Sequence, residues 1–151
     1  MNGIDAILAL NKVHEVETSP LDRDALIRLL DCAFHNATAD AGKDGFLIAF
    51  DENADYESAN FRWFKSRYDR FVYVDRVVVA EHARGRGLAR EFYAALFDRA
   101  RAAGHIRIVC EVNLDPPNPG SVAFHTALGF VEVGQAVLEN GKTVSYQERM
   151  L

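Results

Sequence analysis

The chain has 151 residues, of which 49% are hydrophobic and 26% are charged, a length and composition typical of one globular domain. This composition excludes an intrinsically disordered chain. The two cysteines, Cys32 and Cys110, are too few for a disulfide scaffold, and no apolar run reaches the ~20 residues of a transmembrane helix. The first residues lack the basic-then-apolar layout of a secretory signal, so we expect a reducing, cytoplasmic compartment.

The charge balance makes general nucleic-acid binding a poor interpretation. Seventeen Lys and Arg residues stand against 22 Asp and Glu residues, which gives a net charge of −5, whereas nucleic-acid binding needs a basic footprint. We therefore expect neither a nucleic acid nor a membrane as partner. Arginines nevertheless cluster between Arg84 and Arg107, which favours a small anionic ligand. For Arg99 and Arg101, a solvated helix face is the simpler explanation.

Hydrophobic periodicity divides the first third of the chain into two helices and a strand. Apolar spacing predicts helices over residues 4–12 and 19–34, the second beginning at Ser19-Pro20-Leu21-Asp22 with Ser19 as a possible cap. The small polar residues 36–44 indicate a loop, and the apolar residues 45–50 indicate a strand. Residues 51–68 are rich in aromatic side chains but show no clear period.

The remaining two thirds alternate between strand and helix patterns. Strands are predicted over residues 71–80, 106–113, 130–138 and 143–150, and helices over 87–103 and 118–129. Asn140-Gly141 indicates a hairpin turn between the last two strands. We expect Cys110 to face the core. The alternation predicts a single α/β domain over residues 1–151.

A segment rich in glycine and arginine joins the predicted central strand to the long helix that follows it. A helix leaves its first N–H groups unpaired and carries partial positive charge there. Gly85 and Gly87 have no Cβ, so a ligand can approach the backbone closely. These features predict a phosphate or pyrophosphate site, with Arg84, Arg86 and Arg90 adding positive charge. The alternative is a tight turn without a ligand, because neither a P-loop nor a complete dinucleotide fingerprint is present.

Two motifs in this half of the chain resemble a known superfamily. Arg84-x-x-Gly87-x-Ala89, after three valines, resembles motif A of the GNAT (Gcn5-related N-acetyltransferase) superfamily. The segment Asn118–Phe130, which ends in Leu-Gly-Phe, is similar to motif B. The resemblance covers residues 71–133. It implies an α/β (α+β) fold with a mixed, mostly antiparallel sheet, splayed central parallel strands and flanking helices, although the usual first strand is short or absent here.

The resemblance implies an acetyl-coenzyme A-dependent N-acetyltransferase that acts by direct attack of a primary amine in a ternary complex. Glu111 falls where some members place a general base, and Asp75 or a water molecule is the alternative. His125 falls where many members have a tyrosine that protonates the departing thiolate. The backbone and side chains implied to hold acetyl-CoA are those of Val77, Val78, Val79, Arg84, Gly85, Arg86, Gly87, Leu88, Ala89, Arg90 and Asn118.

The chemistry of amine acetylation suits these residue types. An ε-amine has a pKa near ~10.4, so the nucleophile must lose a proton. A carboxyl group in a partly dry site can act as the base, and histidine can donate a proton near neutral pH. Alternatively, Glu111 could pair with an arginine, and His125 could be packed without a chemical role. The histidines show no metal-ligand spacing, so we assign no metal.

The acceptor stays open between a small-molecule amine and a peptide amine. The aromatic stretch 56–73 could shape its pocket, although Trp63, Phe64 and Phe71 could equally belong to the core. An acidic rim could attract a cationic amine, or it could be an exposed loop; its candidates are Asp51, Glu52, Asp55 and Glu57. A homodimer is possible through an apolar final strand.

Two other functions remain open at this point. The first is a GNAT-like module that binds acyl-CoA, or a protein partner in the same groove, without catalysis. The second is a nucleotide-binding α/β domain, which would share only the glycine turn.

Overall fold

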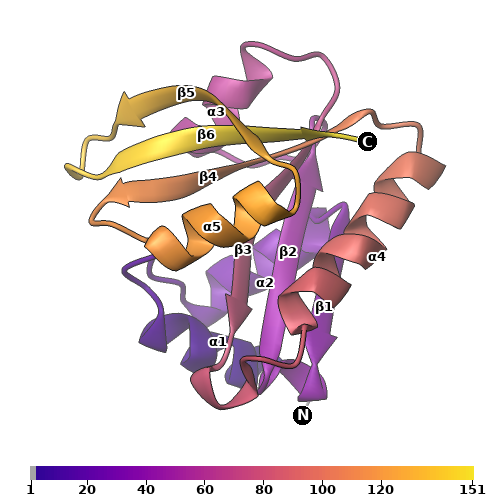
Figure 1. The fold of residues 1–151 in the computed structure, drawn as a ribbon. Helices are drawn as coiled ribbons and strands as arrows, with labels where there is room; N and C mark the ends of the chain where they lie inside the picture. Colours follow the sequence, from indigo (N-terminus) through magenta and orange to yellow (C-terminus); the bar gives the residue numbers. More distant parts are fainter. Residues whose placement is uncertain (1–2) are drawn as a thin grey trace.

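A six-stranded sheet with helices on both faces forms the protein, as seen in a computed structural model that describes residues 3–151 (Figure 1). The helices are α1 (Ile4–Val13), α2 (Arg23–Cys32), α3 (Ala59–Lys65), α4 (Leu88–Ala102) and α5 (Pro119–Ala127). The strands are β1 (His35–Ala39), β2 (Gly45–Asp51), β3 (Val72–Val79), β4 (Arg107–Asp115), β5 (Val131–Val137) and β6 (Thr143–Met150). Short 3₁₀ turns cover Asp40–Gly42 and Glu81–Ala83.

The sheet is mixed and mostly antiparallel, which confirms the predicted fold class. Its strand order is β1-β2-β3-β4-β6-β5, and β3 with β4 forms the one parallel pair among the described strands. This parallel ladder is short, because it joins only Val72 to Ile108 and Tyr73 to Val109. Beyond these pairs the two strands run apart (Figure 1). The predicted splay of the central strands is therefore present.

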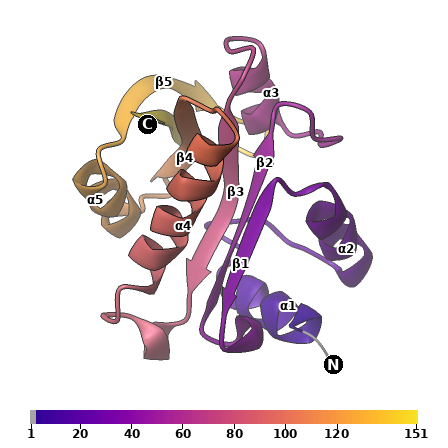
Figure 2. The ribbon, with the colours of Figure 1, turned by 90° about the vertical axis from the view of Figure 1, so that its right-hand side faces the viewer.

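Alternating side chains of the strands build one apolar layer on each face of the sheet. Helices α1, α2 and α3 cover one face, and α4 covers the other, as the view along the sheet shows (Figure 2). Fully buried Phe46, Phe50 and Tyr73 belong to the first layer. Leu96 and Cys110 belong to the second, so the prediction that Cys110 faces the core is confirmed.

Two predictions about the N-terminal third are wrong in detail. The second helix does not take Ser19 as its cap; Asp22 does, accepting a hydrogen bond of 2.8 Å from the Ala25 amide. The Ser19 hydroxyl instead meets a buried arginine on β3. Residues 36–44, predicted as a loop, begin with strand β1, whose small and polar side chains suit an edge strand paired antiparallel to β2.

The aromatic segment before β3 contains the unpredicted helix α3. Ser58 caps it by accepting a hydrogen bond of 3.1 Å from the Phe61 amide. Phe64 is fully buried in the core, and Trp63 stacks on Tyr146 of β6 with ring centroids 4.1 Å apart. This seven-residue helix is too short for a clear helical period, which is why its pattern was not found.

The first element of the described chain and the edge strand β5 relate to two further predictions, the missing first strand and the homodimer. Within residues 3–151, the first element is α1 and no strand precedes it, so the expected departure from the family's usual first strand is present. Strand β5 forms an outer edge of the sheet and exposes Val131, Val133 and Val137. A homodimer stays a prediction. No helix of residues 3–151 combines the length and apolar character needed to cross a membrane.

We predict that Gly134→Ala destabilises the fold. A Cβ at this position on β5 would collide with the indole of Trp63, which is itself fixed against Tyr146. Overpacking of this kind costs about 1–3 kcal/mol, so the melting temperature should fall by roughly 2–12 °C. Gly120→Ala is the control, because a Cβ there has no neighbour within 4 Å among the described residues. Equal melting temperatures for both variants would contradict the packing described.

Candidate active site

A groove of about 480 Å³ lies beside the diverging part of β3. Its walls come from β3, the glycine turn, the start of α4 and the first turns of α5. All residues predicted to hold the cosubstrate line it, with the exception of Arg86. The ladder to β4 ends at Tyr73, so within the described chain the edge of β3 from Val77 to Val79 has no strand partner on that side. An extended ligand can use this edge like an added strand.

The glycine turn has the geometry that the sequence predicted. Gly85 and Gly87 have φ angles of +80° and +77°, a region that side-chain-bearing residues rarely adopt. A Cβ on either glycine would have no described neighbour within 4 Å, so the backbone lies open to the groove. Gly87 is the N-cap of α4, and no side-chain hydrogen bond caps that end in the described structure. Free amides and a helix dipole together are the features that suit an anion.

Asp44, which sequence analysis missed, holds this turn from outside. Its carboxylate contacts His82 Nε2 at 2.8 Å and accepts a hydrogen bond of 3.3 Å from Arg86 Nη2. The hydrogen bond with His82 keeps the pKa of Asp44 below its usual value. Arg86 therefore braces the turn rather than lining the groove. The contact links residues 38 or more positions apart in the chain, so no local pattern could have revealed it.

A second cavity of about 500 Å³ lies on the other side of the splay. Tyr56, Tyr73 and Val144 form part of its wall, together with polar side chains of α3 and the turn before β6. The predicted acidic rim does not line it. Its acidic lining residues are instead Glu17, Asp75, Glu111 and Glu139. Of the aromatic stretch, Phe64 and Phe71 are fully buried core residues.

A small cavity of about 70 Å³ shares lining residues with both of these spaces. Asn118 and Ser121 line both the groove and the small cavity. Asp75 and Glu111 line both the small cavity and the second cavity. A ligand in the groove can therefore present a reactive end to a molecule in the second cavity across the gap between β3 and β4.

Glu111 lies on β4, two residues past the last parallel pair. Its Oε1 accepts a hydrogen bond of 2.6 Å from the hydroxyl of Tyr73. Burial raises the pKa of Glu111 to about 8, although the bond from Tyr73 lowers it. The partner of Glu111 is thus a tyrosine, not the arginine that sequence analysis considered. A carboxyl group with this pKa exchanges protons readily near neutral pH.

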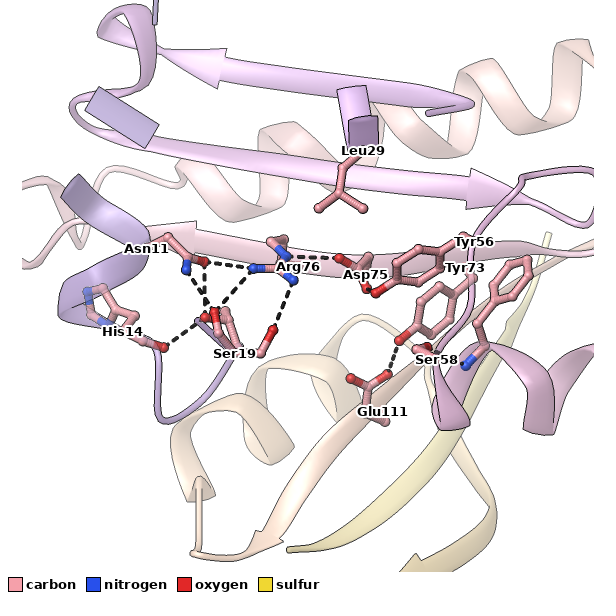
Figure 3. Close-up of polar contacts among 12 residues, drawn as sticks. Asn11, His14, Ser19, Leu29, Tyr56, Ser58, Tyr73, Asp75, Arg76 and Glu111 are labelled. Carbon is pink, nitrogen blue, oxygen red and sulfur yellow. Dashed lines mark hydrogen bonds and ion pairs between the residues drawn. The ribbon is translucent and has the colours of Figure 1, made fainter. Parts of the chain in front are cut away.

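The alternative carboxylate, Asp75, belongs to a buried ion pair. Its Oδ2 accepts a bond of 2.8 Å from Arg76 Nε, and its Oδ1 accepts one of 2.6 Å from the Tyr56 hydroxyl (Figure 3). Arg76 also donates to Asn11 of α1 and to the hydroxyl of Ser19, each at 3.0 Å. This network ties the connection between α1 and α2 to the middle of β3.

The connection between α1 and α2, residues 14–22, forms a wall shared by all three cavities. Glu17 and Thr18 line each of them. Asn113 of β4 donates a bond of 3.4 Å to the Glu17 carbonyl, and Lys142 donates one of 2.6 Å to the Val16 carbonyl. The segment therefore crosses the splay and is tied to both sides. In the sequence these residues only precede the start of a helix, which gives no sign of this role.

His125 is buried in α5, and both of its ring nitrogens have partners. Nδ1 lies 2.8 Å from the Ser121 carbonyl, which can only accept, so we assign the proton to Nδ1. Nε2 then accepts from the Tyr93 hydroxyl at 2.7 Å. Burial lowers the pKa of His125, which keeps the ring neutral at pH 7. Tyr93, on α4, is a wall residue of the small cavity that sequence analysis missed.

Comparison with known protein families identifies the fold. Residues 10–130 match the family model described as the acetyltransferase (GNAT) family. The chain belongs to the GNAT acetyltransferase family. The resemblance of the two sequence motifs to the GNAT superfamily is thereby confirmed. Both motifs of this GNAT domain lie within the matched residues. A comparison with curated protein sequences finds no significant match.

Solved structures agree with this membership. Ard1 from Thermoplasma volcanium matches with a TM-score of 0.76 at 13% identity, covering 99% of this chain and 91% of that one. The NatC complex bound to Gag peptide and CoA matches at 0.72 and 14% identity, with the same two coverages. The ribosomal-protein-alanine N-acetyltransferase from Brucella melitensis matches at 0.68 and 20% identity, covering 98% and 94%. At these identities the likeness shows a shared fold.

The groove of this GNAT domain fits coenzyme A on its own evidence. The open amides at Gly85 and Gly87 suit a pyrophosphate, the free edge of β3 suits an extended pantetheine arm, and Arg84 and Arg90 add positive charge. The described residues bring together no group of three or more His, Cys, Asp or Glu side chains able to hold a metal ion.

We predict that Gly87→Glu weakens CoA binding by about 100-fold or more, because it places a carboxylate and a strained backbone at the anion site. Isothermal titration calorimetry with CoA measures this change. Gly141→Glu is the matched control, since Gly141 has a similar φ of +86° and open surroundings but lies in the turn before β6. Similar CoA affinity in both variants would contradict the assignment of the anion site.

Proposed function

We propose that this chain is an N-acetyltransferase, which transfers the acetyl group of acetyl-CoA to a primary amine by direct attack in a ternary complex. The observation that carries the proposal is the position of Glu111. Its carboxyl group lines the junction between the cosubstrate groove and the second cavity, with a pKa near 8. A base at this junction can reach a nucleophile that enters from the second cavity.

Two parts of acetyl-CoA contact the protein: the pantetheine arm and the pyrophosphate. The amides of Gly85 to Arg90 hold the pyrophosphate, while the free edge of Val77 to Val79 pairs with the pantetheine arm. Asn118, at the N-terminus of α5, contacts the arm near its thiol end. Pairing of this kind directs the thioester into the gap between β3 and β4, where a strand N–H can stabilise the developing oxyanion.

The transfer step needs one proton acceptor and ends with a thiolate. The amine nitrogen attacks the thioester carbonyl, the C–N bond forms, and the nitrogen gives a proton to Glu111. The C–S bond then breaks and coenzyme A leaves as the thiolate, which takes up a proton. No acyl-enzyme is needed, in keeping with the buried position of Cys110.

His125 stays the predicted source of the thiolate proton. Its Nδ1 lies 3.2 Å from the hydroxyl of Ser121, which lines the groove. Because the resting ring is neutral and both of its nitrogens are engaged with other groups, His125 must first take up a proton itself, and that proton has to reach the thiolate through Ser121 or water.

The acceptor is a primary amine of a small molecule or of a peptide. A cavity of about 500 Å³ has the size of a small-ligand site and is open to solvent. Two structural neighbours are named for peptide or protein substrates: one binds Gag peptide, and one is a ribosomal-protein-alanine N-acetyltransferase. An α-amine, with a pKa of ~7.7–8.0, matches a base of pKa about 8 better than an ε-amine at ~10.4 does.

An assay of thiol release from acetyl-CoA against a panel of amines tests the proposal. The panel contains amino acids, polyamines, lysine derivatives and short peptides with free N-termini. Acetyl-dependent thiol release with at least one amine supports the enzyme. Binding of CoA without thiol release from any amine would favour the non-catalytic module instead.

We predict that Glu111→Gln lowers kcat by about 100-fold or more, as expected for loss of a general base, with CoA affinity changed by no more than about twofold. In the wild type, kcat/KM should rise with pH and level off above about 8, because the base must be ionised. Steady-state kinetics between pH 6 and 10 measure both effects. Asp98→Asn, at an exposed position on α4, is the control and should keep the wild-type rate. Full activity of Glu111→Gln would exclude Glu111 as the base.

A further inference from the structure

Two tyrosine hydroxyls contact two different carboxylates where β3 and β4 separate (Figure 3). Tyr73 donates to Glu111 and Tyr56 donates to Asp75, each over 2.6 Å. Both carboxylates line the small cavity and the second cavity. The site thus contains two similar tyrosine–carboxylate pairs, although the reaction needs only one carboxylate as its base.

The surroundings of the two carboxylates differ. Asp75 forms a buried ion pair with Arg76, in which the side chains are 5% and 6% exposed. Both carboxylate oxygens of Asp75 accept hydrogen bonds, one from the guanidinium and one from Tyr56. Asp75 is therefore the counter-charge of a buried guanidinium, and both of its oxygens already have donors. Glu111 has no such ion pair with a described side chain.

We propose that Tyr73 is the positioning residue that orients Glu111 toward the acceptor and makes it, rather than Asp75, the group that takes the proton. This inference rests on the proposed function. Tyr73 donates its hydroxyl hydrogen to Oε1, so the carboxylate keeps a fixed orientation and can receive the proton of the amine on its other oxygen.

The backbone places Tyr73 for this role. It is the last residue of β3 that pairs with β4, and Glu111 follows the last pair on β4 by two residues. The tyrosine side chain therefore spans the start of the gap. Its ring is fully buried and contacts Phe61 and Phe64, with centroids 5.7 and 6.0 Å away. This packing keeps the hydroxyl aimed at Glu111.

Several groups from neighbouring elements act on Glu111. Besides Tyr73, β3 contributes Asp75, which raises the pKa of Glu111, and Arg76, which lowers it. Tyr93 of α4, Tyr146 of β6 and the neighbouring Cys110 also interact with its charge. Burial keeps the hydroxyl of Tyr73 protonated far above neutral pH, so it remains a donor throughout the working range. The hydrogen bond from Tyr73 lowers the pKa of Glu111, whereas burial and Asp75 raise it. Loss of the Tyr73 hydroxyl should therefore raise the pKa of Glu111.

The test compares Tyr73→Phe with Tyr56→Phe in the pH dependence of kcat/KM. Each change removes one hydroxyl and keeps the ring. The acidic limb is the part of the profile where kcat/KM rises with pH. We expect Tyr73→Phe to shift the midpoint of this limb to higher pH by about one unit, as loss of a hydrogen bond to a charged group would. Its rate should then be about tenfold lower at pH 7 and close to wild type above the shifted limb. Tyr56→Phe should leave the limb in place.

Two outcomes overturn the proposal. In the first, Tyr73→Phe lowers the rate by a constant factor at every pH, which indicates a structural role. In the second, the limb moves in Tyr56→Phe and not in Tyr73→Phe, which makes Asp75 the base. A second variant guards against misfolding of Tyr73→Phe: site-specific 3-fluorotyrosine at position 73 keeps the shape, donates more strongly and should move the limb downward. An unmoved limb in the fluorinated protein also overturns the proposal.

Carboxyl ¹³C NMR separates this inference from the proposed function. The Glu111 signal, assigned by its loss in Glu111→Gln, is titrated in the wild type and in Tyr73→Phe without any substrate. A higher midpoint in Tyr73→Phe supports the positioning role even if no amine is acetylated, which would refute the transferase alone. An identical midpoint in both proteins refutes the positioning role even if the wild type is an active transferase.

Discussion

The early end of the parallel ladder between β3 and β4 is the constraint on which the site depends. Two residue pairs hold the strands together, and beyond them each strand follows its own neighbour, β2 for β3 and β6 for β4. An isolated strand edge inside a protein leaves backbone groups without partners, which costs free energy unless a ligand or water satisfies them. The gap is therefore both a structural cost and the place where an extended cosubstrate can bind.

Polar groups around the gap are compensated in different ways. Asp75 and Arg76 neutralise each other in the interior, and the same guanidinium anchors α1 and the segment before α2. A buried pair of this kind adds specificity of arrangement more than stability, because desolvation offsets its attraction. The side chain of Glu111 accepts a hydrogen bond from a neutral group, the hydroxyl of Tyr73, and has no counter-ion among the described residues. Burial therefore raises its pKa strongly. Glu111 thus has a neutral hydrogen-bond partner where Asp75 has a buried counter-ion.

Local sequence signals predicted the parts of the site that local backbone geometry creates. The glycines of the turn need positive φ angles, Asn118 caps α5 with Pro119 in its first turn, and β3 is rich in β-branched valine. Each of these depends on residues adjacent in the chain. The position of Glu111 followed from the resemblance in the same way, because the strand between the two motifs has a fixed place.

Long-range contacts created the parts that sequence analysis missed. Strand β1 forms because β2 offers an edge, although its own residues favour a loop. The hydroxyl of Tyr73 meets a residue 38 positions away, and Lys142 reaches a carbonyl 126 positions away. No periodicity encodes such pairs, so the tyrosine partner, Asp44 behind the glycine turn and the wall formed by residues 14–22 required the three-dimensional structure.

Amide hydrogen exchange with and without coenzyme A tests the central claim most directly. If the open edge of β3 and the glycine turn hold the cosubstrate, saturating CoA should slow exchange at Val77–Val79 and at Gly85–Leu88 by about tenfold or more. The outer strands β1 and β5 should exchange as before. Unchanged exchange at both segments under saturating CoA, or protection confined to another part of the sheet, would contradict the account.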